Sequence, residues 1–135
     1  MLFSRCETTD CITFSSRFVS VQFLDTATSN PKAIEFSLIT AIDSEVIFYS
    51  DTLSSQYYLP VNTDSEQTTF LFLNIDNSID TLSLIYDKKE KLISEDCGFD
   101  LLFNNVEIEF TTFNKAESLG NDLSRLNEEN IKIYH

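Results

Sequence analysis

Histidine and cysteine, two residue types that often carry catalytic chemistry, are few in this chain. Catalysis by a serine or cysteine nucleophile needs a base beside it, and the single histidine is His135, the last residue. A histidine at a chain end is typically solvated, so we expect no Ser–His or Cys–His site. Cys6, Cys11 and Cys97 lack the spacing of a zinc site, and no glycine-rich phosphate loop is present. We therefore predict a protein that is not an enzyme and holds no cofactor or metal.

Acidic residues offer two further chemical possibilities. Glu107 and Glu109 alternate along one segment, and paired carboxylates can hydrolyse glycosides. We interpret them as the hydrated face of a strand, with an acid-dependent hydrolase as an alternative function. Residues 74–80 place oxygen-bearing side chains at alternate positions, as a calcium loop does. The central glycine is missing and Ile85 stands where a bidentate glutamate belongs, so we predict a hairpin turn at 76–78 (Asp-Asn-Ser).

Two adjacent aromatic residues, Tyr57 and Tyr58, could stack on sugar rings if they were exposed. We expect them to pack in the core or at a sheet edge instead, because Pro60 follows and favours the end of an edge strand. Because of these tyrosines and the calcium-like segment at 74–80, a carbohydrate- or calcium-binding module is an alternative function.

These residues must be positioned by a series of short β-strands. Alternating apolar and polar residues, together with short apolar runs, predict strands at 17–24, 33–40, 45–49, 56–60, 68–75, 80–87, 106–110 and 130–135. Both faces of residues 68–75 are apolar, which favours a central position in a sheet. We expect a further turn at 88–90 (Lys-Lys-Glu), and loop with weak strand over 115–130, where a short helix is the alternative.

About eight or nine short strands predict an all-β protein, a single-domain antiparallel β-sandwich. The 135 residues fit one domain. We divide the chain into an N-terminal tether segment at 1–16 and a β-sandwich domain at 17–135. The predicted core residues are Val19, Val21, Phe23, Phe36, Phe70, Phe72, Leu82, Leu84, Val106, Ile108 and Phe110.

The charge of the chain excludes several classes of partner. The formal net charge is −13, so the lysines and arginines that phosphates require are scarce, and we expect no nucleic-acid partner. A basic patch for anionic lipid is disfavoured for the same reason. The sequence contains no run of about twenty apolar residues, so we predict no membrane-spanning segment. We expect a soluble monomer.

Four short motifs along the chain are Cys-x4-Cys-Ile at 6–12, Tyr-Leu-Pro-Val at 58–61, Asp-Cys-Gly-Phe at 96–99 and Ile-Lys-Ile-Tyr-His at 131–135. Together they resemble a family of small Bacteroidetes envelope lipoproteins of unknown function. The resemblance implies that Cys6 carries a lipid in the periplasm or outer membrane, although Arg5 stands where Gly, Ala or Ser normally precedes such a cysteine. It also implies a non-enzymatic module that binds or supports an envelope protein or glycan.

The oxidising envelope implied by this resemblance allows two nearby cysteines to pair. We predict a disulfide between Cys11 and Cys97, which leaves Cys6 over. Gly98, directly after Cys97, suggests a backbone bend at such a covalent anchor. The alternatives are a Cys6–Cys97 bridge and three free thiols in a cytosolic protein.

Overall fold

The computed structural model of the chain contains two packed β-sheets. It describes residues 18–42, 44–94, 98–120, 123 and 129–135, and over 90–94 and 98–102 only the course of the backbone. The predicted tether segment and the three cysteines lie outside these residues. The strands are β1 (Phe18–Leu24), β2 (Ile34–Ala41), β3 (Tyr49–Ser54), β4 (Gln56–Pro60), β5 (Gln67–Asn74), β6 (Ile79–Ser94), β7 (Gly98–Thr111), β8 (Lys115–Ser118) and β9 (Ile131–Tyr134).

One sheet has four strands in the order β4-β1-β9-β8, and the other has five in the order β3-β2-β5-β6-β7. The neighbouring strands are antiparallel except for β1 and β9, which are parallel. The predicted all-β sandwich is therefore confirmed. β5 is central and β4 is an edge strand, as the sequence predicts, and no helix in the described part of the chain is long and apolar enough to span a membrane.

Aromatic rings fill the space between the sheets. Phe23 of β1 has its ring centroid 5.3 Å from Phe36, 5.9 Å from Tyr57, 6.2 Å from Phe72 and 5.8 Å from Phe113. Most of these pairs are T-shaped, the geometry that the ring quadrupole favours. The predicted core residues that prove to be buried are Val19, Val21, Phe23, Phe36, Phe70, Phe72, Leu82, Leu84 and Val106, and Ile108 packs against them half-buried.

The prediction that Phe110 lies in the core is wrong, because its side chain is 56% exposed. Ser83 pairs with Phe110 while Leu84 pairs with Ile108, so Glu109 is an extra residue in β7. This β-bulge shifts the alternation by one residue and turns Phe110 outward. Glu109 points to the same outer face, where its carboxylate accepts hydrogen bonds from the side chains of Gln67 and Ser83.

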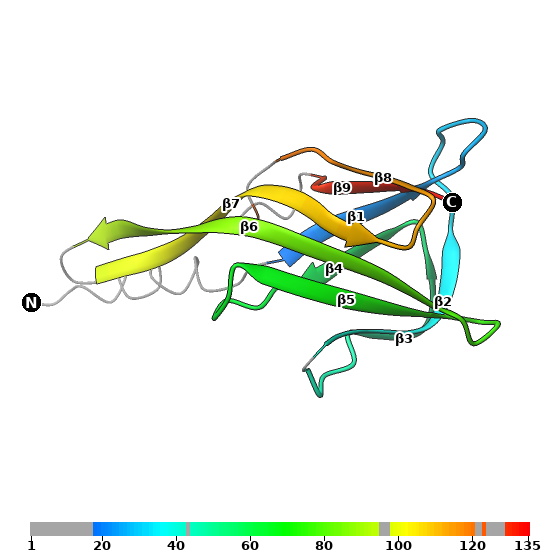
Figure 1. Ribbon diagram of the computed structural model, residues 1–135, viewed down its shortest axis with the longest axis horizontal. Helices are drawn as coiled ribbons and strands as arrows, with labels where there is room; N and C mark the ends of the chain where they lie inside the picture. Colours follow the sequence, from blue (N-terminus) through cyan, green and yellow to red (C-terminus); the bar gives the residue numbers. More distant parts are fainter. Residues whose placement is uncertain (1–17, 43, 95–97, 121–122, 124–128) are drawn as a thin grey trace, which may run out of the picture.

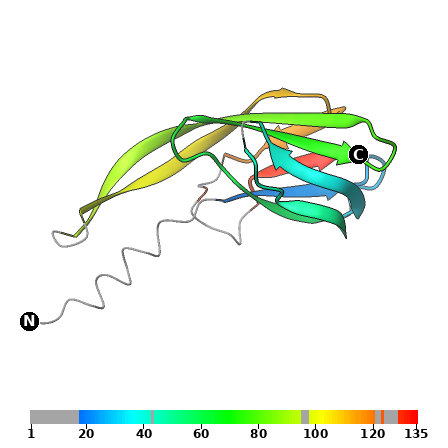
Figure 2. The same ribbon diagram turned by 90° about the horizontal axis from the view of Figure 1, so that it is seen from below.

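The turn predicted at 88–90 is also absent, because β6 runs without interruption from Ile79 to Ser94. β5 pairs with β6 only as far as Ile85, whereas β7 accompanies β6 to Ser94. The last part of β6 and the first part of β7 therefore leave the sandwich as a two-stranded ribbon (Figures 1 and 2). The segment contains no glycine, proline or asparagine to force a turn, and lysines suit a solvated strand.

The predicted strand at 45–49 is displaced, since β3 begins at Tyr49 and residues 44–48 belong to the connection from β2. The hydroxyl of Thr40 donates to the carbonyl of Val46 (2.6 Å), and the amide of Phe48 donates to Ile39 (2.9 Å). These bonds hold the apolar run Val-Ile-Phe in a bend. Tertiary packing here overrides a strand-like local composition.

Two of the four edge strands, β4 and β7, are partly capped by the chain's own groups. On β4, the hydroxyl of Tyr49 lies 3.2 Å from both the amide and the carbonyl of Tyr58. On β7, the carbonyl of Val106 accepts from Ser118, and that of Phe103 accepts from the amide of Leu123 (3.0 Å). Such capping protects an edge from pairing with foreign strands.

Candidate functional site

An open groove of about 860 Å³ lies at the end of the sandwich where β2 and β4 end and β5 begins. We call it the end groove; it is lined by residues of the segments 41–48 and 60–69. Ala41 and Val61 are buried and Phe48 is half-buried, so the inner wall is apolar. Concave sites with apolar walls and a few polar groups are typical of ligand binding.

One wall of the end groove is the connection between β2 and β3. The exposed aliphatic side chains of this connection that line the groove are Ile42 (52%) and Val46 (61%). The amide of Ile42 still donates to Thr69 of β5 (2.9 Å), and the amide of Val46 donates to the hydroxyl of Ser44 (3.1 Å). With the Thr40 bond to Val46, these contacts fix the wall before any ligand is present, which lowers the ordering cost of binding.

The opposite wall is the connection between β4 and β5. The amide of Asn62 donates to Thr68 Oγ1 (2.8 Å), the hydroxyl of Tyr86 donates to the carbonyl of Asn62 (2.8 Å), and the two hydroxyls lie 2.6 Å apart. The three bonds form a closed ring of hydrogen bonds. Because the Tyr86 hydroxyl gives its one hydrogen to Asn62, the hydroxyl of Thr68 is the donor to Tyr86. Asp64 and Gln67 add local bonds, because their amides donate to Asn62 Oδ1 and Ser65 Oγ.

The ring of hydrogen bonds around Tyr86 is buried, since this side chain is 3% exposed and Thr68 5%. Burial raises the pKa of the Tyr86 hydroxyl above its ordinary value, and the hydrogen bond from Thr68 opposes the rise. The tyrosine therefore stays a neutral donor and holds the wall at ordinary pH.

A second depression of about 460 Å³ adjoins the end groove at the base of the ribbon. We call it the acidic hollow because Glu66, Asp87 and Glu107 line it. Glu66 Oε2 accepts from the amide of Lys88 (3.2 Å), and Asp87 Oδ2 accepts from Asn105 Nδ2 (2.7 Å). Asn105 has a left-handed φ of 54°, a conformation that asparagine tolerates better than most residues, where the β6–β7 register shifts.

The two depressions share lining residues, and both are acidic. Ser65 and Gln67 line both of them. Glu45 and Asp64 line the end groove, and no lysine, arginine or histidine is among the described residues that line either depression. The site therefore combines an apolar wall with a one-sided negative charge.

The structure places the paired acids that the sequence suggests, Glu107 and Glu109, in different surroundings. Glu107 lines the acidic hollow, whereas Glu109 is engaged with Gln67 and Ser83. Both are exposed, as predicted for the hydrated face of a strand. Among the described residues, no group of three or more His, Cys, Asp or Glu side chains is placed to hold a metal ion.

His135 lies at the other end of the sandwich, where β1 and β9 finish. Its ring centroid is 6.4 Å from Phe23 and 6.2 Å from Phe113, and its amide donates to the carbonyl of Leu24 (2.9 Å). The side chain is exposed, as expected, and its ring packs edge-on against the rings of Phe23 and Phe113.

The calcium-like segment at 74–80 is the predicted hairpin turn. Asp76 Oδ1 accepts from the amide (2.9 Å) and hydroxyl (2.6 Å) of Ser78, and these bonds lower the pKa of Asp76. Asp80 accepts from Asn74 (2.9 Å) and Thr112 (2.9 Å). These hydrogen bonds engage Asp76 and Asp80 with neighbouring side chains and the backbone, as in a hairpin turn.

Tyr57 and Tyr58 separate to opposite faces of β4. Tyr57 is fully buried, and its hydroxyl lies 2.7 Å from the carbonyl of Ile34 and 2.9 Å from that of Thr52, so it cannot stack on a ligand. Tyr58 is 37% exposed. The expectation of core or edge packing is confirmed for Tyr57.

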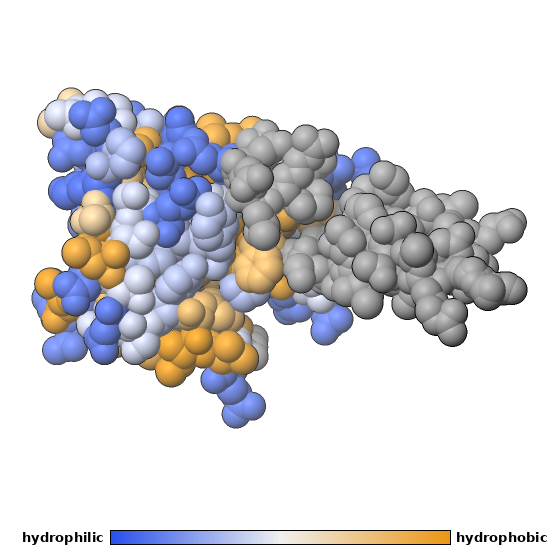
Figure 3. Space-filling model, turned by 180° about the vertical axis from the view of Figure 1, so that it is seen from behind, coloured by the Kyte–Doolittle hydropathy of each residue, from blue (hydrophilic) through white to orange (hydrophobic). Residues whose placement is uncertain are grey.

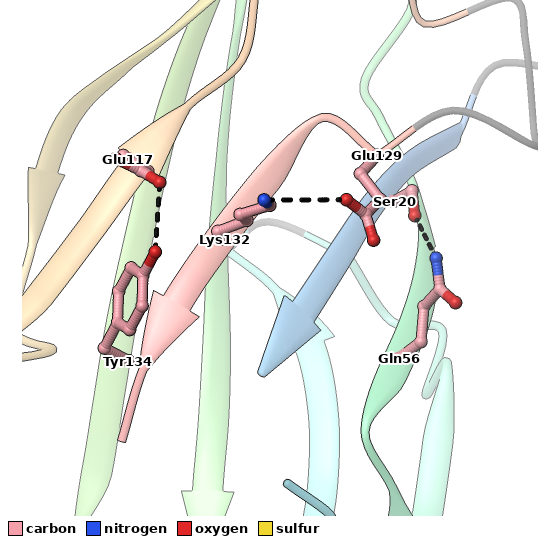
Figure 4. A network of polar contacts seen from close by, with 6 residues as sticks. All are labelled: Ser20, Gln56, Glu117, Glu129, Lys132 and Tyr134. Atoms are coloured by element: carbon pink, nitrogen blue, oxygen red, sulfur yellow. Dashed lines mark hydrogen bonds and ion pairs between the residues drawn. The ribbon is translucent and has the colours of Figure 1, made fainter. Parts of the chain in front are cut away.

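The outer face of the four-stranded sheet carries three polar side-chain pairs, two of which form rungs between neighbouring strands. Gln56 donates to Ser20 (2.8 Å), Tyr134 donates to Glu117 (3.2 Å), and Lys132 lies 4.0 Å from Glu129. Figure 4 shows these six residues side by side over β8, β9, β1 and β4. The back view in Figure 3 is hydrophilic to intermediate in its centre, and hydrophobic side chains gather at its lower edge.

The residues of the end groove were missed by sequence reasoning. The alternation-free apolar run Val-Ile-Phe at 46–48 is typical of a strand, and the polar residues Ser44 and Glu45 just before it are the sequence feature that fits a connection between β2 and β3 instead. No sequence pattern indicates that Glu66 and Asp87 line the same depression, because this depends on the register between β5 and β6.

The fold and the site define a class of protein: an all-β sandwich with an apolar, acid-rimmed groove at one end. Residues 37–135 match the model of a family of unknown function, DUF6452, and the chain belongs to this family. The expectation of a family without an assigned function is therefore confirmed. No curated protein and no solved structure matches the chain.

Proposed function

We propose that the chain is a non-enzymatic module of the cell envelope that binds or supports another envelope component through its end groove. The observation that carries this proposal is the groove itself, with the buried wall of Ala41 and Val61 and the exposed rim of Ile42 and Val46. Both walls are fixed by hydrogen bonds, as expected of a surface organised for binding rather than for folding alone.

The envelope location is supported by the motif resemblance and by the positions of the cysteines in the sequence. We propose that Cys6 carries a lipid and that Cys11 pairs with Cys97. Phe18 pairs with Pro60, which lines the end groove, so the chain enters β1 at the groove end of the sandwich. An N-terminal anchor would thus keep the groove close to the membrane surface that holds it.

Mass mapping of the mature protein from its native envelope tests these assignments. We expect a lipid-modified peptide at Cys6 and, without reduction, a cross-linked peptide that joins Cys11 to Cys97. Fatty-acid labelling should disappear in Cys6→Ser and persist in Cys97→Ser. A Cys11 peptide that alkylates without prior reduction would defeat the disulfide, and an unmodified Cys6 would defeat the anchor.

Photocross-linking tests the groove. A photoreactive amino acid is placed at Val46 in one variant and at Leu53 in the control, because Leu53 is equally exposed (64%) but lies on β3, outside the groove. In a native envelope fraction, position 46 should give a discrete adduct that excess wild-type protein suppresses. The competitor Val46→Asp should fail to suppress it, whereas Leu53→Asp should succeed. Equal adducts at both positions, or equal competition, would overturn the proposal.

A second candidate function is glycan binding at the polar face of the four-stranded sheet. The observation in its favour is Tyr58, which is exposed beside the Gln56–Ser20 rung. A glycan array that gives a signal lost in Tyr58→Ala and kept in Val46→Asp would favour this candidate. An array on which no glycan binds the protein would contradict glycan binding at this face.

A further inference from the structure

We propose that the segment bound at this end is cationic as well as apolar: an extended stretch of a partner protein with one aliphatic or aromatic side chain in the end groove and Lys or Arg side chains over the acidic hollow. This inference rests on the proposed function, because it names the chemistry of what the groove binds. The two parts of the segment follow from two different properties of the surface.

The apolar part follows from the groove. Phe48 packs edge-on against Phe70 of the core, with ring centroids 6.3 Å apart, so the inner wall is anchored to the hydrophobic interior. Ile42 and Val46 stand at the rim with more than half of their surface in water. A side chain that entered the groove beside them would cover the apolar surface of this wall, as anchor residues do at the centre of protein interfaces.

The cationic part follows from the unpaired acids. Five acidic side chains line the two depressions: Glu45, Asp64, Glu66, Asp87 and Glu107. None of them forms an ion pair with a residue that the structure describes. In a chain of net charge −13, such a surface repels acidic partners, and it favours the approach of a basic one.

The acids are positioned rather than loose. The amide of Lys88 holds Glu66, and the amide group of Asn105 holds Asp87. The ammonium of Lys88, the basic group of β6 nearest to them in sequence, is directed instead to the carbonyl of Thr63 (3.5 Å). The ammonium of Lys88 therefore does not form an ion pair with the described acids of the hollow.

The two parts are joined by the connection that both depressions share. Ser65 and Gln67 line the groove on one side and the hollow on the other. An extended segment that crosses this connection advances about 3.3 Å per residue, so a few residues separate the apolar anchor from the basic side chains. The pattern we infer is therefore an apolar residue followed or preceded at short range by lysine or arginine.

Fluorescence anisotropy with three labelled peptides tests the inference on the full chain. The probes are Phe-Leu-Ser-Lys-Lys-Lys, Phe-Leu-Ser-Glu-Glu-Glu and Ser-Gly-Ser-Lys-Lys-Lys, each amidated at its C-terminus. We expect the first to bind at least about tenfold more tightly than the other two, and to weaken when salt rises from about 0.05 M to about 0.5 M. Equal binding of the glutamate peptide, or no binding of the first, would overturn the inference.

Matched variants localise the effect. Combining Glu66→Gln, Asp87→Asn and Glu107→Gln neutralises the hollow, and the control combines Glu35→Gln, Asp51→Asn and Glu117→Gln on other exposed surfaces. The first set should weaken the basic apolar peptide by at least about tenfold, and the control by less than about twofold. Equal weakening in both sets would mean that charge acts without a site and would overturn the inference. All variants change exposed side chains, and an unchanged melting curve verifies folding.

The two proposals fail in different ways. If Val46→Asp weakens the peptide while the neutralised hollow does not, the groove function stands and the cationic preference is wrong. If neither variant matters, this inference is wrong, and the photocross-link at Val46 then decides the proposed function by itself.

Discussion

Phe72 and Phe110 are both assigned to the core from the sequence, yet only Phe72 is in the core. Phe72 is fully buried and contacts three other rings, whereas Phe110 is mostly in water. Sequence alternation cannot distinguish them, because the bulge at Glu109 depends on pairing with β6. A single extra residue therefore decides which side chain stabilises the fold.

Truncation of these two side chains should give very different losses of stability. Phe72→Ala removes a ring from a close-packed site and should lower the free energy of unfolding by about 3–5 kcal/mol. Phe110→Ala should lower it by less than about 1 kcal/mol. Urea unfolding followed by circular dichroism measures both, and similar losses in the two variants would contradict the assignment of Phe110 to the outer face.

Tyr57 gives the stability a dependence on alkaline pH. Burial raises the pKa of this hydroxyl from 10 to about 12. The folded state therefore retains the proton where the unfolded chain loses it. The stabilisation is complete below about pH 10 and is lost as pH rises toward 12.

Tyr57→Phe tests this linkage. The substitution removes the hydroxyl near Ile34 and Thr52, so the free energy of unfolding should fall by about 1 kcal/mol at neutral pH. Its decline between pH 10 and 12 should then be shallower than in the wild-type protein. The control Tyr58→Phe should keep the wild-type slope, and the same slope in both variants would refute the role of Tyr57.

At the scale of elements, the existence of most strands follows from the sequence, and their limits do not. The strands β1, β2, β4, β5 and β9 lie close to their predicted positions because each carries an alternation, a short apolar run or a marked end residue such as Pro60. β6 is far longer than predicted because Lys88 and Lys89 look like a turn in sequence. Pairing with β7 supplies the hydrogen bonds that keep them extended.

The connection between β4 and β5 depends on its ring of hydrogen bonds, and a double-mutant cycle can measure this. Tyr86→Phe and Thr68→Val should each cost roughly 1–3 kcal/mol, since each leaves a buried group without its partner. The double variant should lose less than the sum, because both changes break the same ring. Strictly additive losses in chemical denaturation would show that the two hydroxyls act independently.

At the scale of the whole molecule, the two ends of the sandwich differ in kind. One end carries His135 and the self-contained turn at 76–78, whose polar groups bond to one another. The other end carries the end groove, the acidic hollow and the ribbon of β6 and β7 (Figure 1). The sequence predicts the sandwich from local patterns, but the groove is assembled from segments far apart in the chain and has no local pattern to reveal it.

The central claim is that this end binds another envelope component. Its most direct test is a nuclear magnetic resonance titration of ¹⁵N-labelled protein with a detergent-solubilised native envelope fraction. The account predicts that amide signals of residues 42–48 and 62–67 broaden, and that Val46→Asp abolishes the effect while Leu53→Asp does not. Broadening confined to the outer face of the four-stranded sheet, or no broadening at all, would contradict it.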